Sequence, residues 1–243
     1  AAGVRLATAK RGGVTVTRVE IAREGLARPR GRYVTLEMPS VSVLDERDTD
    51  VIETGAAELR ALLPPEGPVL VLGIGNRRVT ADALGPRTAQ KILVTMGPQH
   101  TLPVRGIRPV AALAPGVSGD TGLTLRQLAA AMVDAVRPAA LICVDSLCSA
   151  EAARLGRTIQ FSDTGLHPAD ARHARHLDAA ALGVPVIAAG IPTLMDADEG
   201  ADLVLTPRAL DSVIAHGSAL LAGILNRALQ PRLSVAQLCW LTG

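Results

Sequence analysis

A strand pattern that runs directly into a glycine turn, within residues 68–86, constrains the fold of this chain more than any other feature. Residues 69–73 form an unbroken apolar run, which predicts a strand buried on both faces. Glycines such as Gly75 then allow backbone to approach backbone, and Asp82 stands just before a helical pattern. A carboxylate between a buried strand and a helix is typical of a site at the carboxyl end of a parallel strand. The stretch therefore predicts an α/β fold whose chemistry lies at the strand ends.

Two interpretations of Asp82 follow from the residues alone. Asp is among the commonest helix N-caps, which contribute roughly 0.5–2 kcal/mol. The same carboxylate, at the end of a buried strand, can instead be catalytic or hold a metal. Phosphate binding is disfavoured, because Arg78 interrupts the G-x-G-x-x-G pattern and the Walker lysine is missing.

The rest of the chain alternates strand and helix patterns. These predict an α/β protein: a three-layer, twisted, mostly parallel sheet flanked by helices, with an N-terminal β-hairpin appendage. One domain is expected over 1–243, with the appendage at 1–40 and the α/β core at 45–243. The expected strands cover 3–8, 14–21, 32–38, 69–73, 108–114, 139–145, 157–162 and 185–189, and the expected helices cover 45–63, 82–96, 123–136 and 207–228.

Two of these segments carry more detailed expectations. The polar alternation of residues 157–162 predicts a strand near a sheet edge. Thr206 followed by Pro207 predicts the start of the long closing helix, with Thr206 as its cap.

Composition excludes several classes of function. With one Tyr, one Phe, one Trp and a formal net charge of +2, the chain lacks both the aromatic platforms and the basic excess that direct nucleic-acid binding requires. We expect no signal peptide and no membrane span, since no apolar run of about 18 residues occurs. Three cysteines in apolar settings indicate buried thiols in a reducing, cytoplasmic compartment. No cofactor is predicted.

Polar residues follow several of the predicted strands. Because the carboxyl ends of parallel strands share one edge of a sheet, we expect these residues on one rim. Asp145 is the most telling, since a carboxylate after an apolar run adds little to packing, and a helix cap is its alternative role. Among the other residues expected on this rim are Asp82, Gly116, Asp163, His167 and Thr193.

Two carboxylates from separate strands are suited to hydrolysis. Close together they share one proton, because two like charges cannot both ionise, and the pair can activate a water and protonate a leaving amine. With His167, Asp82 and Asp145 could instead hold a metal, although a single histidine is more often structural. The serine-hydrolase pattern G-x-S-x-G and the zinc pattern H-E-x-x-H do not occur.

Several blocks, in the same order along the chain, resemble the germination protease family of spore-forming bacteria. The most specific are residues 73–86, which contain Asp82, and residues 158–168, which contain His167. Further matching blocks cover 31–37, 115–117, 144–147, 182–187, 190–193 and 204–207, so the resemblance spans nearly the whole chain.

The resemblance implies a phosphorylase/hydrolase-like fold similar to that of hydrogenase-maturation endopeptidases. It implies an endopeptidase that degrades the small acid-soluble proteins coating spore DNA, in the spore core, during germination. Members are made as zymogens, form homotetramers and use an atypical aspartic mechanism whose two acids match Asp82 and Asp145. Residues 169–176 depart from the family's glycine-rich basic stretch, a long insertion before the last helix is absent, and the sequence starts after the expected propeptide zone.

From the residues and the resemblance together, we expect Asp82 and Asp145 to be catalytic, with no metal. Two rivals stay open: a hydrogenase-maturation-like peptidase with a metal on Asp82, Asp145 and His167, and a module that binds peptides without cutting them. The residues expected to bind substrate or to support the catalytic pair are Gly75, Asn76, Gly116, Asp163, His167 and Thr193.

Overall fold

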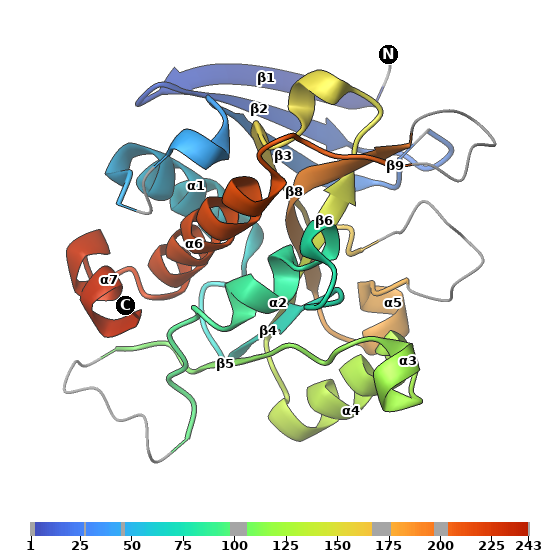
Figure 1. Cartoon of the computed structure of the whole chain (residues 1–243). Helices are drawn as coiled ribbons and strands as arrows, with labels where there is room; N and C mark the ends of the chain where they lie inside the picture. Colours follow the sequence, from blue (N-terminus) through green and yellow to red (C-terminus); the bar gives the residue numbers. More distant parts are fainter. Residues whose placement is uncertain are drawn as a thin grey trace.

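One nine-stranded sheet runs through the molecule, with helices on both of its faces (Figure 1). The structure is a computed structural model, and it describes residues 3–26, 28–44, 47–97, 106–166, 176–196 and 204–242. The strand order is β1-β2-β3-β7-β8-β6-β4-β5, and β9 (Val204–Leu205) pairs with β8. A sheet between two helical layers confirms the predicted three-layer α/β class.

The N-terminal strands continue this sheet. β1 (Val4–Arg11) and β2 (Val14–Ile21) form the predicted hairpin, and β3 (Gly31–Glu37) pairs with β2 to extend it into an antiparallel meander. β3 pairs with β7 (Thr158–Ser162), which joins the meander to the rest of the sheet. Hydrogen bonding is therefore continuous from β1 to the centre of the molecule.

The central strands are parallel, and β4 and the first half of β6 are fully buried. β5 (Val110–Leu113), β4 (Val69–Gly73), β6 (Ala140–Cys148) and β8 (Val186–Asp196) lie side by side in that order. The full sheet is mixed rather than mostly parallel, because β7 runs antiparallel to both β3 and β8.

The predicted edge position of residues 157–162 is wrong, since β7 lies between two strands. Its alternation has another cause: Ile159 and Phe161 are buried in the main core, whereas Gln160 and Ser162 are half-buried on the other face. Unequal burial of two faces produces the same pattern as an exposed edge.

Two groups of helices cover the sheet. α1 (Thr49–Leu62), α2 (Leu84–Ala89) and α6 (Leu210–Leu229) contribute to one core cluster, and α4 (Leu125–Val136) and α5 (Ala179–Leu182) pack with the other. Figure 1 shows α4 and α5 gathered with the short α3 (Ser118–Thr121), away from α1 and α6. α7 (Val235–Thr242) packs against α6. The remaining elements are the 3-10 turns η1 (Val41–Val43), η2 (Thr80–Asp82) and η3 (Ala152–Arg154).

Two helix starts differ from the sequence expectations. The helix expected at 82–96 is the six-residue α2, which begins at Leu84. α6 begins at Leu210 with Ala209 at its N-cap and no side-chain cap bond, so the predicted cap at Thr206 is wrong. Among the described residues, α6 alone is long and apolar enough to span a membrane, but the 67% burial of its apolar window is that of a core helix.

Candidate active site

The turn that follows β4 holds the Asp82 side chain through a hydrogen bond from the turn's own backbone. The backbone N–H of Asn76 donates to Asp82 Oδ2 over 2.7 Å. Gly75, the residue before Asn76, has a φ of +123°, and a Cβ there would fall 2.1 Å from the Asp82 carbonyl oxygen. The turn therefore requires a glycine at position 75, and it draws Gly75, Asn76 and Asp82 into one unit.

Asp82 is not the N-cap of the following helix. That place is taken by Ala83, which makes no side-chain cap bond, whereas Asp82 is the last residue of η2. The cap interpretation is therefore wrong. The carboxylate receives a backbone N–H from the loop before it, that of Asn76.

Two further glycines allow α2 to pack closely against the ends of the central strands. A Cβ on Gly85 would lie 2.2 Å from the Ile74 carbonyl oxygen and 2.3 Å from that of Val144, and a Cβ on Gly73 would lie 2.2 Å from the Gly85 carbonyl oxygen. Only glycine permits such contacts. They fix the chain just after Asp82 against both β4 and β6.

Asp145 lies on the neighbouring strand at the same end of the sheet. The last β4–β6 pair joins Gly73 to Val144, so Asp145 is the first residue of β6 beyond the end of β4. Its Oδ1 accepts the N–H of Ser146 at 2.8 Å. The strand was expected to stop at Asp145, but it continues to Cys148 because β8 extends alongside it.

The charge of Asp145 acts on its buried neighbour. Burial raises the pKa of the Cys143 thiol far above its usual range, and the negative charge of Asp145 raises it further. The two residues are two apart on one strand and thus share a face of the sheet. Cys143 is consequently kept as a neutral thiol beside the site.

Thr193 supports the Asp82 turn from β8. Its side chain is fully buried, and its hydroxyl donates to the Ala81 carbonyl oxygen over 3.0 Å. The structure thus places Thr193 beneath η2, away from solvent. Ser146 adds a feature not anticipated from the sequence: its Oγ is buried and has no hydrogen-bond partner among the described residues.

A hollow of about 670 Å³ adjoins the Asp82 turn. Gly75, Asn76 and Gly116 all line it, together with residues of α2 and of β5, so the structure brings three of the expected substrate-binding residues together. Gly116 has a φ of +80° in the loop after β5. Glycine loops with accessible backbone N–H groups can bind a developing oxyanion.

The prediction that Asp163 shares this rim is wrong. β7 is antiparallel to β8, with Ser162 opposite Ala188, so Asp163 lies toward the amino end of β8, whereas Asp145 is level with Gly190. Asp163 accepts bonds of 2.7 Å from both the backbone N–H and the Nε of Arg32. This carboxylate ties β7 to β3 instead of joining the Asp82 end. His167 lies outside the described residues.

In the described part of the chain, no group of three or more His, Cys, Asp or Glu side chains is arranged to hold a metal ion. The metal set proposed as an alternative includes His167, which is not described. The described members of that set, Asp82 and Asp145, each accept a backbone N–H.

Comparison with known proteins assigns the family. A family model described as germination protease matches residues 1–200. The chain belongs to the germination protease family. Germination protease from Clostridium perfringens (strain 13 / Type A) is 32% identical over 90% of this chain and 86% of its own length. That from Caldanaerobacter subterraneus subsp. tengcongensis is 40% identical over 76% of this chain and 61% of its own.

A search of solved structures gives a more distant similarity. The [NiFe] hydrogenase maturation protease HycI from Thermococcus kodakarensis KOD1 aligns with a TM-score of 0.46 and 18% identity, over 71% of this chain and 98% of that one. The family membership rests on the sequence matches, and it makes this chain a peptidase that acts on protein substrates.

Proposed function

We propose that this germination protease cleaves small acid-soluble DNA-coat proteins of spores through a water activated between Asp82 and Asp145. The observation that carries the proposal is that the two carboxylates stand at the same end of the neighbouring strands β4 and β6. Family membership supports the peptidase activity. The choice of substrate rests on the resemblance of the sequence blocks to that family.

In the proposed reaction the two carboxyls share one proton. The ionised carboxylate accepts a proton from the water, whose oxygen attacks the peptide carbonyl carbon. The protonated carboxyl donates its proton as the tetrahedral intermediate collapses and the amine leaves. The water thus contributes its oxygen to the new carboxyl product and its proton to the pair, which restores the starting state.

The loops beside the pair supply the other requirements of this chemistry. Backbone N–H groups near Gly75 or Gly116 would stabilise the oxyanion, because both loops line the hollow beside the Asp82 turn. Thr193 would keep η2, and hence Asp82, in place against β8. Asn76 would hold the Asp82 carboxylate in one orientation.

Substitution of each acid tests the proposal. We expect Asp82→Asn and Asp145→Asn each to lower proteolysis of a spore DNA-coat protein by about 10²–10⁴-fold, because an amide cannot exchange the proton. Asp134→Asn, the same change on the exposed face of α4, should retain full activity. Circular dichroism would verify that the variants are folded. Full proteolysis by either folded active-site variant would reject the assignment.

The same assay separates the rivals. Peptidase activity that persists in chelator supports the two-carboxylate mechanism. Activity that is lost in chelator and recovers when a divalent metal is added would favour the metal-dependent mechanism. Fragment mapping by mass spectrometry would identify a pure binding module, because such a module leaves its partner intact.

We further propose, from the family resemblance alone, synthesis as a zymogen, assembly as a homotetramer and action in the spore core.

A further inference from the structure

Among the buried polar side-chain atoms of the described residues, the hydroxyl oxygen of Ser146 is the one that forms no hydrogen bond. The residue as a whole is half-buried, so its side chain turns the hydroxyl inward. Other buried hydroxyls close to the site do have partners: that of Thr193 donates to Ala81, and that of Thr88 donates to the Leu84 carbonyl oxygen over 2.8 Å. An unpaired buried hydroxyl lowers stability unless another group satisfies it. The fold alone therefore does not explain the Ser146 hydroxyl.

The backbone of Ser146 holds the carboxylate of Asp145. In a strand the backbone groups of every second residue point toward the same neighbouring strand, so those of Ser146 point as those of Val144 do. The Val144 carbonyl oxygen accepts the N–H of Ile74 at 2.8 Å, just past the end of β4. The Ser146 N–H points to the same side and donates to Asp145 Oδ1. The Asp145 carboxylate is thus drawn toward the space beyond β4, where the Asp82 turn begins.

The side chain of Ser146 lies on the face of the sheet that carries η2. Side chains two apart on a strand share a face, and Val144 belongs to the core cluster formed with α2 and α6. Ile191, opposite Ser146 on β8, belongs to the same cluster. Thr193, two residues further along β8, donates its hydroxyl to η2 from this face. Ser146 therefore contacts one acid of the pair through its N–H and has its hydroxyl on the face that carries the other.

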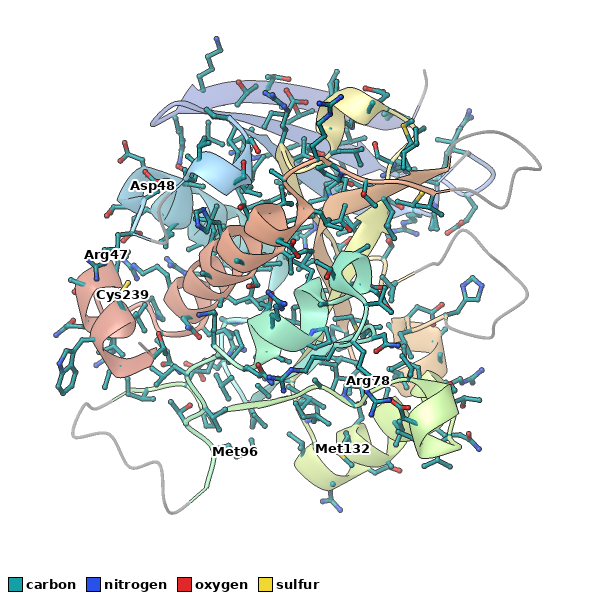
Figure 2. The ribbon with its side chains drawn as sticks, in the orientation of Figure 1. Arg47, Asp48, Arg78, Met96, Met132 and Cys239 are labelled. Carbon is teal, nitrogen blue, oxygen red and sulfur yellow. The ribbon has the colours of Figure 1, made fainter. Side chains whose placement is uncertain are left out.

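The cationic side chains of the loop before η2 are engaged elsewhere. Arg78 lies near α3 (Figure 2), where it pairs with Asp120 at 3.8 Å. With its amide turned to match its neighbours, Gln90 at the end of α2 accepts from Arg77 at 2.5 Å. The two arginines closest to the turn in sequence thus have other partners, and a neutral hydroxyl is left beside the acids.

We propose that the Ser146 hydroxyl binds the water that attacks the peptide bond. This inference rests on the proposed function, which puts that water between Asp82 and Asp145. One O–H of the water donates to the ionised carboxylate and loses its proton there, and the other donates to Ser146 Oγ and stays on the oxygen. The lone pair of the water is then directed at the carbonyl carbon. Such positioning adds to the rate, because a displacement of about 1 Å can cost about 10²-fold.

A role for Ser146 as the nucleophile itself fits less well. A serine nucleophile needs a base within hydrogen-bond reach, and Ser146 Oγ has no hydrogen-bond partner among the described residues. Its backbone N–H is also committed to Asp145. The hydroxyl is therefore better suited to holding a water than to attacking the substrate.

Variants that differ only in the hydroxyl test the proposal. Ser146→Ala should lower kcat for a spore DNA-coat protein about 10–10²-fold and change KM less than about 2-fold, since it removes a contact to water and not to substrate. Ser146→Thr keeps a hydroxyl and should retain kcat within about 3-fold. Ser146→Val has the shape of threonine without the hydroxyl, so its kcat should fall as in Ser146→Ala. The urea midpoint of Ser146→Ala should stay the same or rise, because an unpaired buried hydroxyl is removed.

Ser149→Ala is the matched control, directly after β6. Ser149 is 8% exposed, and its hydroxyl donates to the Glu151 carbonyl oxygen over 2.9 Å and accepts the Glu151 N–H at 3.1 Å. We expect the opposite pattern for this variant: a lower urea midpoint and an unchanged kcat. A fall in both quantities for Ser146→Ala would indicate a hydroxyl with a structural role and would overturn the proposal.

Three further results would overturn it. These are an unchanged kcat in Ser146→Ala, equal kcat values for Ser146→Thr and Ser146→Val, and covalent labelling of Ser146 by a fluorophosphonate, which would identify a nucleophile. Coupling to the acids gives a fourth measurement. Added to Asp82→Asn, Ser146→Ala should lower the residual single-turnover rate by less than about 2-fold, because both residues act on one water. A full additional loss would contradict a shared water.

The two proposals fail separately. If the Asn variants of both acids lost proteolysis and Ser146→Ala kept its kcat, the catalytic pair would stand and the role of Ser146 would be lost. If Asp82→Asn or Asp145→Asn kept full proteolysis, the catalytic pair would be lost. The comparison of Ser146→Thr with Ser146→Val would then still report whether the hydroxyl takes part in the reaction.

Discussion

An alanine methyl group at position 75 would fall 2.1 Å from the carbonyl oxygen of Asp82, and the backbone there has a φ of +123°. Both the clash and the strain of that φ favour displacement of the turn that carries Asp82. We expect Gly75→Ala to lower the free energy of unfolding by at least about 1–3 kcal/mol. At a temperature where the variant is still folded, its proteolytic activity should fall by a larger factor than the small loss of folded protein accounts for. Urea unfolding and peptidase assays measure the two effects.

Gly119→Ala is the matched control. Gly119 lies in the one-turn helix α3, and an added methyl group there meets no atom within 4 Å. Its free energy of unfolding should be unchanged or rise by about 0.5–1 kcal/mol, since alanine is the better helix former. If Gly75→Ala behaved like this control in both assays, the tight closure of the Asp82 turn would not be required for activity.

For individual residues, the sequence predicted contacts best where the two partners are close together along the chain. Gly75, Asn76 and Asp82 lie within eight residues, and the glycine and the carboxylate were both predicted to belong to a site. The hydrogen bond from Asn76 to Asp82 joins residues only six apart, so it does not depend on how distant parts of the chain are arranged. By contrast, nothing in the sequence pairs Asp163 with Arg32, because they are 131 residues apart and the contact depends on strand order.

One ion pair joins two elements far apart in sequence, strand β2 and helix α1. The guanidinium of Arg18 donates to both carboxylate oxygens of Glu58, and the Nε bond measures 2.6 Å. The Glu58 side chain is only 8% exposed, and its hydrogen bond raises the pKa of Arg18. This pair fixes how α1 lies across the N-terminal meander.

We expect Arg18→Met to lower the free energy of unfolding by about 1–3 kcal/mol, because a nearly buried carboxylate would lose its cation. The value is below that of a fully buried pair, since the Arg18 side chain is 38% exposed. Arg18→Met/Glu58→Met should recover much of the loss. Arg5→Met, which breaks the exposed pair of Arg5 with Glu20 at 3.6 Å, should cost less than about 0.5 kcal/mol. Equal losses at Arg18 and Arg5 in urea unfolding would contradict this role.

Elements were predictable in kind but not in direction. Residues 14–21 and 69–73 show strand patterns because their own burial determines them, and both are strands. The direction of β7 depends on pairing with β3 and β8, which no property of residues 158–162 encodes. Because β7 runs antiparallel to β8, Asp163 lies toward the amino end of β8, away from Asp82 and Asp145. The extension of β6 to Cys148 likewise depends on its long partner β8.

For the molecule as a whole, the N-terminal meander and the α/β part share one core. Val16 and Leu36 of the meander are fully buried in the same cluster as Ile214 and Leu221 of α6. The expected appendage therefore contributes to the interior of the protein. A sequence shows where a β segment begins and ends, but the depth at which it joins the core depends on the helices packed against it.

A core truncation in the meander should consequently destabilise the whole chain. We expect Leu36→Ala to lower the free energy of unfolding by about 2–5 kcal/mol, because the side-chain atoms removed leave a cavity in the shared core. Urea unfolding should stay a single transition, and hydrogen exchange should accelerate in α6 and β4 as well as in β2. Leu6→Ala, on the edge strand with Leu6 69% exposed, should change stability by less than about 0.5 kcal/mol. A second transition in which α6 keeps its original midpoint would show that the meander unfolds independently, and the shared core would then not couple the two parts.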